Sequence, residues 1–182
     1  VLEIKIPASS SFIIESKSLK LYLNSFYKKT FSSDTDVLQK IKKDLSKVST
    51  GNIELKFVKK FQAEPKSLNL NTTTRKYTQN NYPICFDGFR SICPVTSQPD
   101  FAKIYILSSA KIETKWLRKL LSSFKESGEF HEQCIENIFS KLSKMFPNEN
   151  IEVCGRFLRR GGIDINPIRS SKKILFFRSE EH

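Results

Sequence analysis

A thiol and a carboxylic acid lie seven residues apart in the segment 91–102, which reads SICPVTSQPDFA. The thiol is Cys93 and the acid is Asp100. Pro94 and Pro99 stand next to them, and the fixed φ of proline limits how this loop can move. A thiol and an acid on a stiff loop could serve as a nucleophile and its proton donor. Because a lone cysteine is more often a small buried apolar side chain, this stretch alone leaves both interpretations open.

The composition predicts a globular protein of one ordinary domain or two small ones. The chain has 182 residues, of which 38% are hydrophobic and 27% charged, so it can bury a real core. No signal peptide is visible in it and no apolar run is long enough to span a membrane, so no membrane partner is expected. The first residue is Val1, and residues 2–6 already alternate like a strand, so we expect the natural chain to begin upstream.

Cysteine and histidine spacing argues against disulfides and metals. The cysteines at 85, 93, 134 and 154 show no paired spacing, which favours a reducing, cytoplasmic location. There is no Cys-x-x-Cys and there are two histidines, one of them the last residue. His131 with Cys134 would be half of a zinc site, so no metal is expected.

The net charge of +12 has two interpretations. It could mark a nucleic-acid surface, or it could belong to lysine-rich solvated helix faces that also attract a small anionic ligand. Lysines 40, 42, 43 and 47 alternate with apolar helical positions, and no base-stacking motif accompanies them. Direct nucleic-acid binding is therefore not expected.

An internal repeat organises the chain. A shift of 98 residues aligns three separate blocks without a gap, so we infer two copies of one module. The aligned blocks are 15–26 with 113–124, 52–54 with 150–152, and 5–6 with 103–104.

The sequence of each copy predicts a strand, two helices and a second strand, in that order. With the helices on one face of an antiparallel sheet, this is an α+β fold. Period-two strands and 3.6-residue helical stripes carry this prediction. The second helix of each copy has a stripe that includes Val48 in the first and Met145 in the second. Gly161 and Gly162 predict a hairpin turn into a strand at 163–165. The predicted domains are a first module at 1–61, a linker rich in Asn and Thr at 62–84, and a second module at 85–182.

The two copies differ in residues that could do chemistry. Where the first has Ser32–Asp34, ordinary N-cap types, the second has Phe130, His131 and Glu132. These could be a solvated imidazole and a first-turn carboxylate, or they could stack on and hydrogen-bond to a flat heterocycle. The turn at 159–162, with its arginines and glycines, could be plain structure or a phosphate site. The Glu-Ser-Lys run at 15–17 could cap a helix or bind an anion.

Four motifs, taken together and in order, resemble those of the 7-cyano-7-deazaguanine reductases. These enzymes are NADPH-dependent nitrile reductases of queuosine biosynthesis, with the tunnelling fold (T-fold) shared with GTP cyclohydrolase I. The order of these motifs along the chain is similar to that in the two-module branch of the family. The Cys-Pro-Val-Thr sequence, however, is closer to the one-module branch, and residues 60–90 match the family poorly. The motifs are ESKSLKLYL from 15, CPVTSQPD from 93, EFHEQC from 129 and RRGGIDI from 159.

The resemblance implies residue roles. Cys93 would attack the nitrile carbon to form a covalent thioimide, and Asp100 would protonate the nitrogen. NADPH would deliver hydride twice, although the sequence has no glycine-rich Rossmann loop. The implied substrate-binding residues are Ile14, Glu15, Ser16, Phe130, His131 and Glu132. The implied cofactor-binding residues are Ser16, Lys17, Arg160 and Gly161.

The resemblance also implies an oligomer, with a homodimer favoured, that completes the barrels of the T-fold. Two rival functions stay open. One is a basic T-fold module that binds tRNA through the +12 charge. The other is an amidotransferase-like relative that shares the cysteine but performs no reduction.

Overall fold

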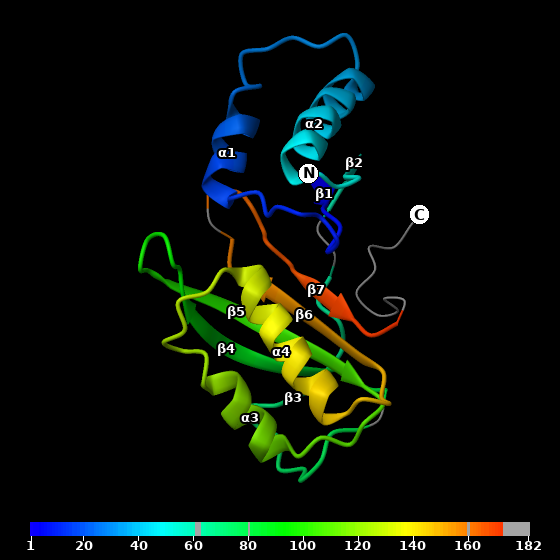
Figure 1. The fold of residues 1–182 in the computed structure, drawn as a ribbon, viewed down its shortest axis with the longest axis vertical. Coiled ribbons are helices and arrows are strands. Elements are labelled where there is room, and N and C mark those ends of the chain that lie inside the picture. Colours follow the sequence, from blue (N-terminus) through cyan, green and yellow to red (C-terminus); the bar gives the residue numbers. More distant parts are fainter. Residues whose placement is uncertain (61–62, 80, 160, 173–182) are drawn as a thin grey trace. The chain divides into compact units, whose positions relative to one another are not determined.

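The computed structural model of the protein describes residues 1–60, 63–79, 81–159 and 161–172. The chain divides into two compact units, Val1–Ala63 and Glu64–His182 (Figure 1). Both units combine helices with paired strands, so the fold is α+β, as predicted. Across the described ranges, no helix is long and apolar enough to cross a membrane.

The first unit pairs two short strands with two helices. β1 and β2 are antiparallel, with Ile4 opposite Leu55. Three apolar side chains are buried, Ile41, Leu45 and Ile53, and partly buried residues of α1 pack around them. Val48 is exposed, contrary to the predicted stripe, and the buried residue in the last turn of α2 is Ser49 instead. The elements are β1 (Leu2–Lys5), α1 (Ser16–Asn24), α2 (Asp34–Ser49) and β2 (Glu54–Phe57).

The second unit is a five-stranded sheet in the order β3-β4-β5-β6-β7, with α3 and α4 over one face (Figure 1). β3 pairs with β4 in parallel and every other pair is antiparallel. The strands are β3 (Leu68–Asn69), β4 (Ile84–Ile92), β5 (Pro99–Ser108), β6 (Ile151–Phe157) and β7 (Ile168–Ser170). The helices are α3 (Thr114–Ser122) and α4 (His131–Met145).

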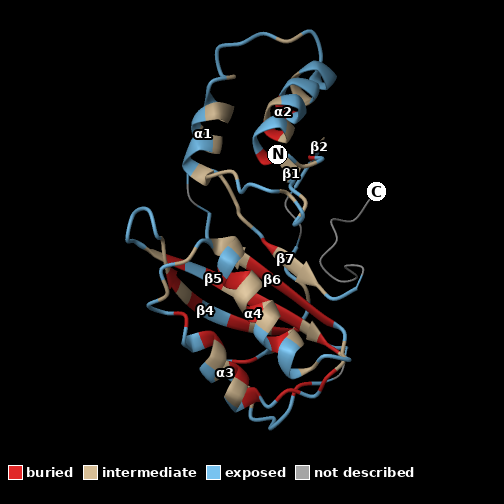
Figure 2. Ribbon diagram, in the orientation of Figure 1, coloured by how far each residue is buried: buried red, intermediate tan, exposed pale blue. Residues whose placement is uncertain are grey.

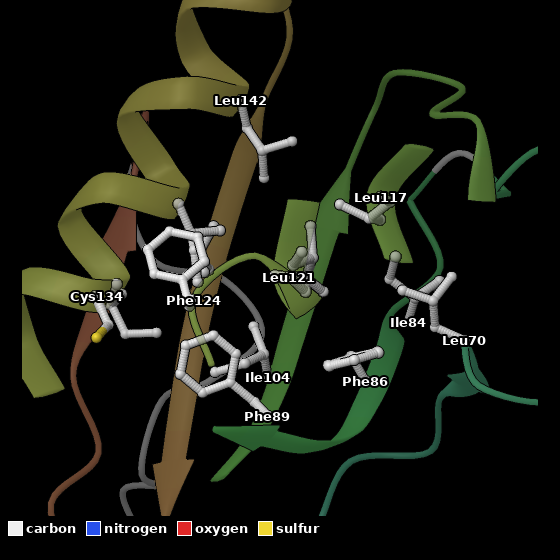
Figure 3. Close-up of a cluster of buried hydrophobic side chains, with 14 of the residues drawn as sticks. Leu70, Ile84, Phe86, Phe89, Ile104, Leu117, Leu121, Phe124, Cys134 and Leu142 are labelled. Carbon is white, nitrogen blue, oxygen red and sulfur yellow. The ribbon is translucent and has the colours of Figure 1, made fainter. Parts of the chain in front are cut away.

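The core of the second unit lies between its helices and its sheet. Figure 2 shows the buried residues concentrated on the strands and on the inner faces of α3 and α4. Alternation along β5 sends Ala102, Ile104 and Ile106 toward the helices. In Figure 3, Phe89 and Phe124 face each other between the sheet and the helices. Met145, predicted to be in the α4 stripe, is exposed at the last turn of that helix.

The 98-residue offset is visible in the elements themselves. α1 and α3 each have nine residues and start 98 residues apart. The strand pairing differs between the copies. Ile4 pairs with Leu55, whereas its counterpart Ala102 pairs with Phe157 and not with Val153. A slip of four residues is even, so it keeps every side chain on its original face of the sheet.

Two segments differ from the sequence-based expectation. Residues 64–79 and 81–84, part of the expected linker, lie in the second unit, where Leu70 is fully buried and Leu68 pairs with Ile84. Apolar residues at 68 and 70 anchor this polar stretch despite its composition. The predicted strand at 163–165 is not assigned in that described stretch. The Ile165 carbonyl oxygen accepts from the Phe157 N–H of β6 at 3.3 Å, but the strand paired with β6 is β7.

Candidate active site

Cys93 begins the loop that joins β4 to β5. Its backbone N–H donates to the Gln98 carbonyl oxygen at 2.8 Å, and its own carbonyl oxygen accepts from the Ser97 N–H at 2.9 Å. Ser97 closes the turn with a left-handed φ of 56°. The sheet therefore ends in a compact hairpin that holds the half-buried thiol at a fixed place.

The groups around the thiol favour its ionised form. Burial raises the pKa of Cys93, and the negative charge of Asp100 adds to this effect. Hydrogen bonds from the Thr96 hydroxyl and from the backbone N–H groups of Thr96 and Val95 act in the opposite direction and outweigh both. The net pKa of Cys93 is thus lowered from the ordinary thiol value, which makes the nucleophilic thiolate more accessible.

The other cysteines have the opposite property. Burial raises the pKa of Cys134 and of Cys154 to about 12 in each case, and it also raises the pKa of Cys85. All four cysteines are free thiols. Cys93 is therefore the one cysteine of this chain whose surroundings activate it.

Asp100 lies next to the thiol loop and forms a pair with an imidazole. It is the second residue of β5, and its side chain is only 5% exposed. The Oδ2 atom lies 3.1 Å from Nε2 of His131, the first residue of α4. The His131 ring stacks on Phe157, with 3.9 Å between ring centroids and 18° between ring planes. The structure thus brings together an activated thiol, a buried acid and an oriented imidazole.

The start of α4 also presents an aromatic ring and a second carboxylate. Phe130 is the N-cap residue, makes no side-chain cap hydrogen bond and is 43% exposed. Glu132 is half-buried in the first turn. Just before them, the Glu129 carboxylate accepts a hydrogen bond of 2.9 Å from the Asn137 amide. This arrangement suits a flat, hydrogen-bonding ligand beside the thiol.

The residues expected from the Glu-Ser-Lys motif belong to the first unit. Ile14 packs against its core. Glu15 is the N-cap of α1, and its carboxylate accepts from the Lys17 and Ser18 N–H groups, both at 2.8 Å. The Lys17 hydrogen bond is the main cause of a lowered Glu15 pKa, and partial burial opposes it. Ser16 is half-buried and the Lys17 side chain is exposed.

The arginine–glycine turn is only partly described. Arg159 makes a two-pronged ion pair with Asp164, with N–O distances of 2.8 and 2.9 Å. Gly161 and Gly162 have φ values of 58° and 88°, which side chains rarely tolerate. Arg160 lies outside the described residues. In the ranges that are described, no group of three or more His, Cys, Asp or Glu side chains could hold a metal ion.

Sequence reasoning missed two residues that shape this site. Thr96 supports the thiol through its hydroxyl and its N–H, and its position three residues after Cys93 was the available signal. Phe157 supports the imidazole from β6, twenty-six residues along the chain from His131. No local spacing could reveal that contact, because strand pairing and helix packing create it.

Two family models match most of the chain. Residues 1–57 match the family described as "Nitrile reductase, 7-cyano-7-deazaguanine-reductase N-term", and residues 99–174 match "QueF-like protein".

Proteins named NADPH-dependent 7-cyano-7-deazaguanine reductase are similar over nearly the full chain. The one from Buchnera aphidicola (Schizaphis graminum) is 34% identical over 94% of this chain and 74% of its own length. The one from Colwellia psychrerythraea is 34% identical over 94% and 70%. The one from Legionella pneumophila strain Paris is 37% identical over 92% and 66%. The chain belongs to the family of NADPH-dependent 7-cyano-7-deazaguanine reductases.

Proposed function

We propose that this protein reduces the nitrile of 7-cyano-7-deazaguanine to the primary amine of 7-aminomethyl-7-deazaguanine with NADPH, as a step of queuosine biosynthesis. The observation that carries the proposal is the thiol of Cys93, activated by its own loop beside an acid that His131 holds at 3.1 Å. A nitrile carbon is an electrophile that needs a thiolate, and its nitrogen needs a proton donor.

The first chemical step forms a covalent thioimide. The Cys93 thiolate adds to the nitrile carbon and makes a new C–S bond, while one π bond of the triple bond breaks. The electron pair moves to the nitrogen, which takes a proton from Asp100. His131, at hydrogen-bond distance from that carboxyl, keeps it aimed at the nitrogen through each proton transfer.

The substrate base would lie against the start of α4. Phe130 offers an exposed aromatic face, and Glu132 can accept from the donor N–H edge of a deazaguanine. Ile14, Glu15 and Ser16 would complete the substrate site. Glu15 can take part because a carboxylate has about four acceptor positions, and the cap of α1 leaves some of them free.

The chain's residues fit a phosphate-bearing cofactor through cationic and hydroxyl groups. The exposed Lys17 ammonium and the Ser16 hydroxyl would hold it, together with Arg160 and the exposed backbone of Gly161. The backbone N–H groups of Lys17 and Ser18 already donate to Glu15, so side chains would carry most of this binding. Bound NADPH would supply two hydrides, with an imine held between them. Cys93 would leave as a thiolate before the second hydride.

At the level of architecture, we propose that the two units are T-fold modules and that copies of the chain associate, with a homodimer favoured. The mainly antiparallel sheet under two helices in the second unit supports this proposal. The recurrence of α1 and α3 at one offset supports a duplicated module.

Intact-mass measurement tests the chemistry. Mixed with the nitrile and no NADPH, the protein should gain the mass of one substrate, and a Cys93→Ser variant should gain none. Absence of the adduct in protein that demonstrably binds the nitrile would contradict the mechanism. Lys17→Ala combined with Arg160→Ala, at two residues assigned to the cofactor alone, should abolish NADPH oxidation and leave adduct formation intact. Loss of both NADPH oxidation and adduct formation, or retention of both, would contradict the cofactor assignment.

A further inference from the structure

The His131 imidazole is oriented by two contacts of different kinds. Asp100 approaches Nε2 at 3.1 Å and so fixes the direction in which that nitrogen points. Phe157 lies parallel to the ring, 3.9 Å away between centroids, and so fixes its plane. A hydrogen bond alone leaves the ring free to tilt about the N–O line. The flat contact with Phe157 removes that freedom.

Phe157 is itself held in place by its strand. It is 5% exposed, and its ring meets Phe89 edge-on, with centroids 6.2 Å apart. Gly155, two residues earlier on the same face of β6, leaves the space that the ring and α4 occupy. A Cβ on Gly155 would lie 2.9 Å from Cε2 of Phe157 and 2.8 Å from Cδ1 of Ile135. The absence of a side chain at 155 thus allows the phenyl ring to lean back along the strand.

We propose that Phe157, seated over Gly155, is a positioning residue for the reaction: it sets the plane of the His131 ring so that Nε2 faces the Asp100 carboxyl. This inference rests on the proposed function for its catalytic consequence. The placement of the His131 ring itself does not depend on that function.

The test compares two leucine substitutions in the same core. Phe157→Leu removes the flat face under His131, and Phe124→Leu is the matched control. Phe124 is an aromatic of the same cluster with similar burial, 4% against 5% exposed, and its ring contacts Phe89 and the Lys141 ammonium. Gly155→Ala is a second probe that displaces the Phe157 ring without removing it.

The direct measurement is proton NMR of the imidazole. The sequence has two histidines, and a His131→Gln variant assigns the signals. In the unaltered protein the His131 ring protons should lie upfield, because they sit over the face of a phenyl ring. Phe157→Leu and Gly155→Ala should move them downfield, whereas Phe124→Leu should not. Unchanged signals in Phe157→Leu, or an equal change in the control, would overturn the proposal.

The kinetic measurement addresses the catalytic consequence. Phe157→Leu should lower kcat for nitrile reduction about ten-fold with a smaller change in KM, since misplacing a reacting group slows chemistry more than binding. Phe124→Leu should leave kcat within about two-fold of the original value, a change too small to reflect a displaced reacting group. Equal losses in both variants would mean that Phe157 acts only through stability. If the unaltered protein does not reduce the nitrile, the proposed function fails, while the NMR result still decides the role of Phe157.

Discussion

At the scale of single residues, the candidate site is a balance of groups that act on one sulfur atom. Burial and Asp100 disfavour the thiolate of Cys93, and donors from Thr96 and Val95 favour it more strongly. The same Asp100 that raises the pKa of the thiol is the acid that the reaction needs. The donors on the loop offset this effect, which lets a nucleophile and an acid work side by side.

Replacing Thr96 with Val should make Cys93 a weaker nucleophile near neutral pH. The substitution keeps the shape and removes a hydroxyl that hydrogen-bonds the thiolate, so the pKa of Cys93 should rise toward the ordinary thiol value. The rate of iodoacetamide alkylation at Cys93, followed against pH by peptide mass spectrometry, measures this shift. Thr96→Ser should restore the original curve and Thr74→Val, at an exposed position, should leave it unchanged. A curve unaffected by Thr96→Val would refute the role of the hydroxyl.

Replacing Asp100 with Asn should move two properties in opposite directions. Loss of the negative charge lowers the pKa of Cys93, so alkylation should shift to lower pH. Loss of the proton donor should reduce nitrile reduction by about 10²- to 10⁴-fold. NADPH oxidation and alkylation of the same sample give both readings. A slower alkylation at every pH, paired with retained reduction, would show that Asp100 is not the acid beside the thiol.

At the scale of elements, the two copies of the repeat can be compared with each other at matching positions. Glu15 and Glu113 are the N-cap residues of α1 and α3, 98 residues apart, yet only Glu15 has side-chain cap hydrogen bonds. The same residue type at the same position of a duplicated helix therefore caps the helix with its side chain in one copy and not in the other.

Glu15→Ala should destabilise the protein by about 1 kcal/mol, the usual loss for an N-cap, and Glu113→Ala by clearly less. The folded-state pKa of Glu15 is depressed, so its contribution is present above the unfolded pKa and is lost as pH falls through the folded value. The difference in Tm between Glu15→Ala and the original protein should accordingly shrink in acid. Equal effects of the two substitutions at neutral pH would contradict the capping argument.

Elements were predictable from sequence to the extent that their signals are local. Helical stripes and the 98-residue offset placed α1 and α3, and one short segment of sequence carries both Cys93 and Asp100. The register slip between β5 and β6 and the stacking of His131 on Phe157 were not predictable, because both depend on packing between distant segments. The expected linker failed for a related reason. Buried side chains within it, Leu70, Thr78 and Ile84, outweighed the polar composition around them.

At the scale of the whole molecule, the two units differ in how much apolar surface they bury. Among the residues that the structure describes, the first has three buried apolar residues in its core cluster, and the cluster of the second has nineteen. Each fully buried aliphatic or aromatic side chain contributes about 1.5–3 kcal/mol to stability. The ratio of buried apolar residues between the two units is far larger than the ratio of their lengths, so the second unit gains more stabilisation per residue. The chemistry of Cys93, Asp100 and His131 lies on the better-packed unit, which suits a site that needs fixed geometry.

Hydrogen exchange should therefore be slower in the second unit. Backbone amides of β5 and β6 should be the most protected, and those of α1 and α2 should exchange at least about ten-fold faster, because local opening exposes fewer buried contacts there. Leu45→Ala and Leu142→Ala form a matched pair, each removing one buried leucine, 4% and 0% exposed respectively. Leu45→Ala shortens one of the three buried apolar side chains in the core cluster of the first unit and should accelerate amide exchange throughout α1 and α2. Leu142→Ala removes one of nineteen, so it should leave β5 protected under the same conditions, although α4 around position 142 exchanges faster. Equal protection of the two units in the original protein would show that burial within each unit does not set its stability.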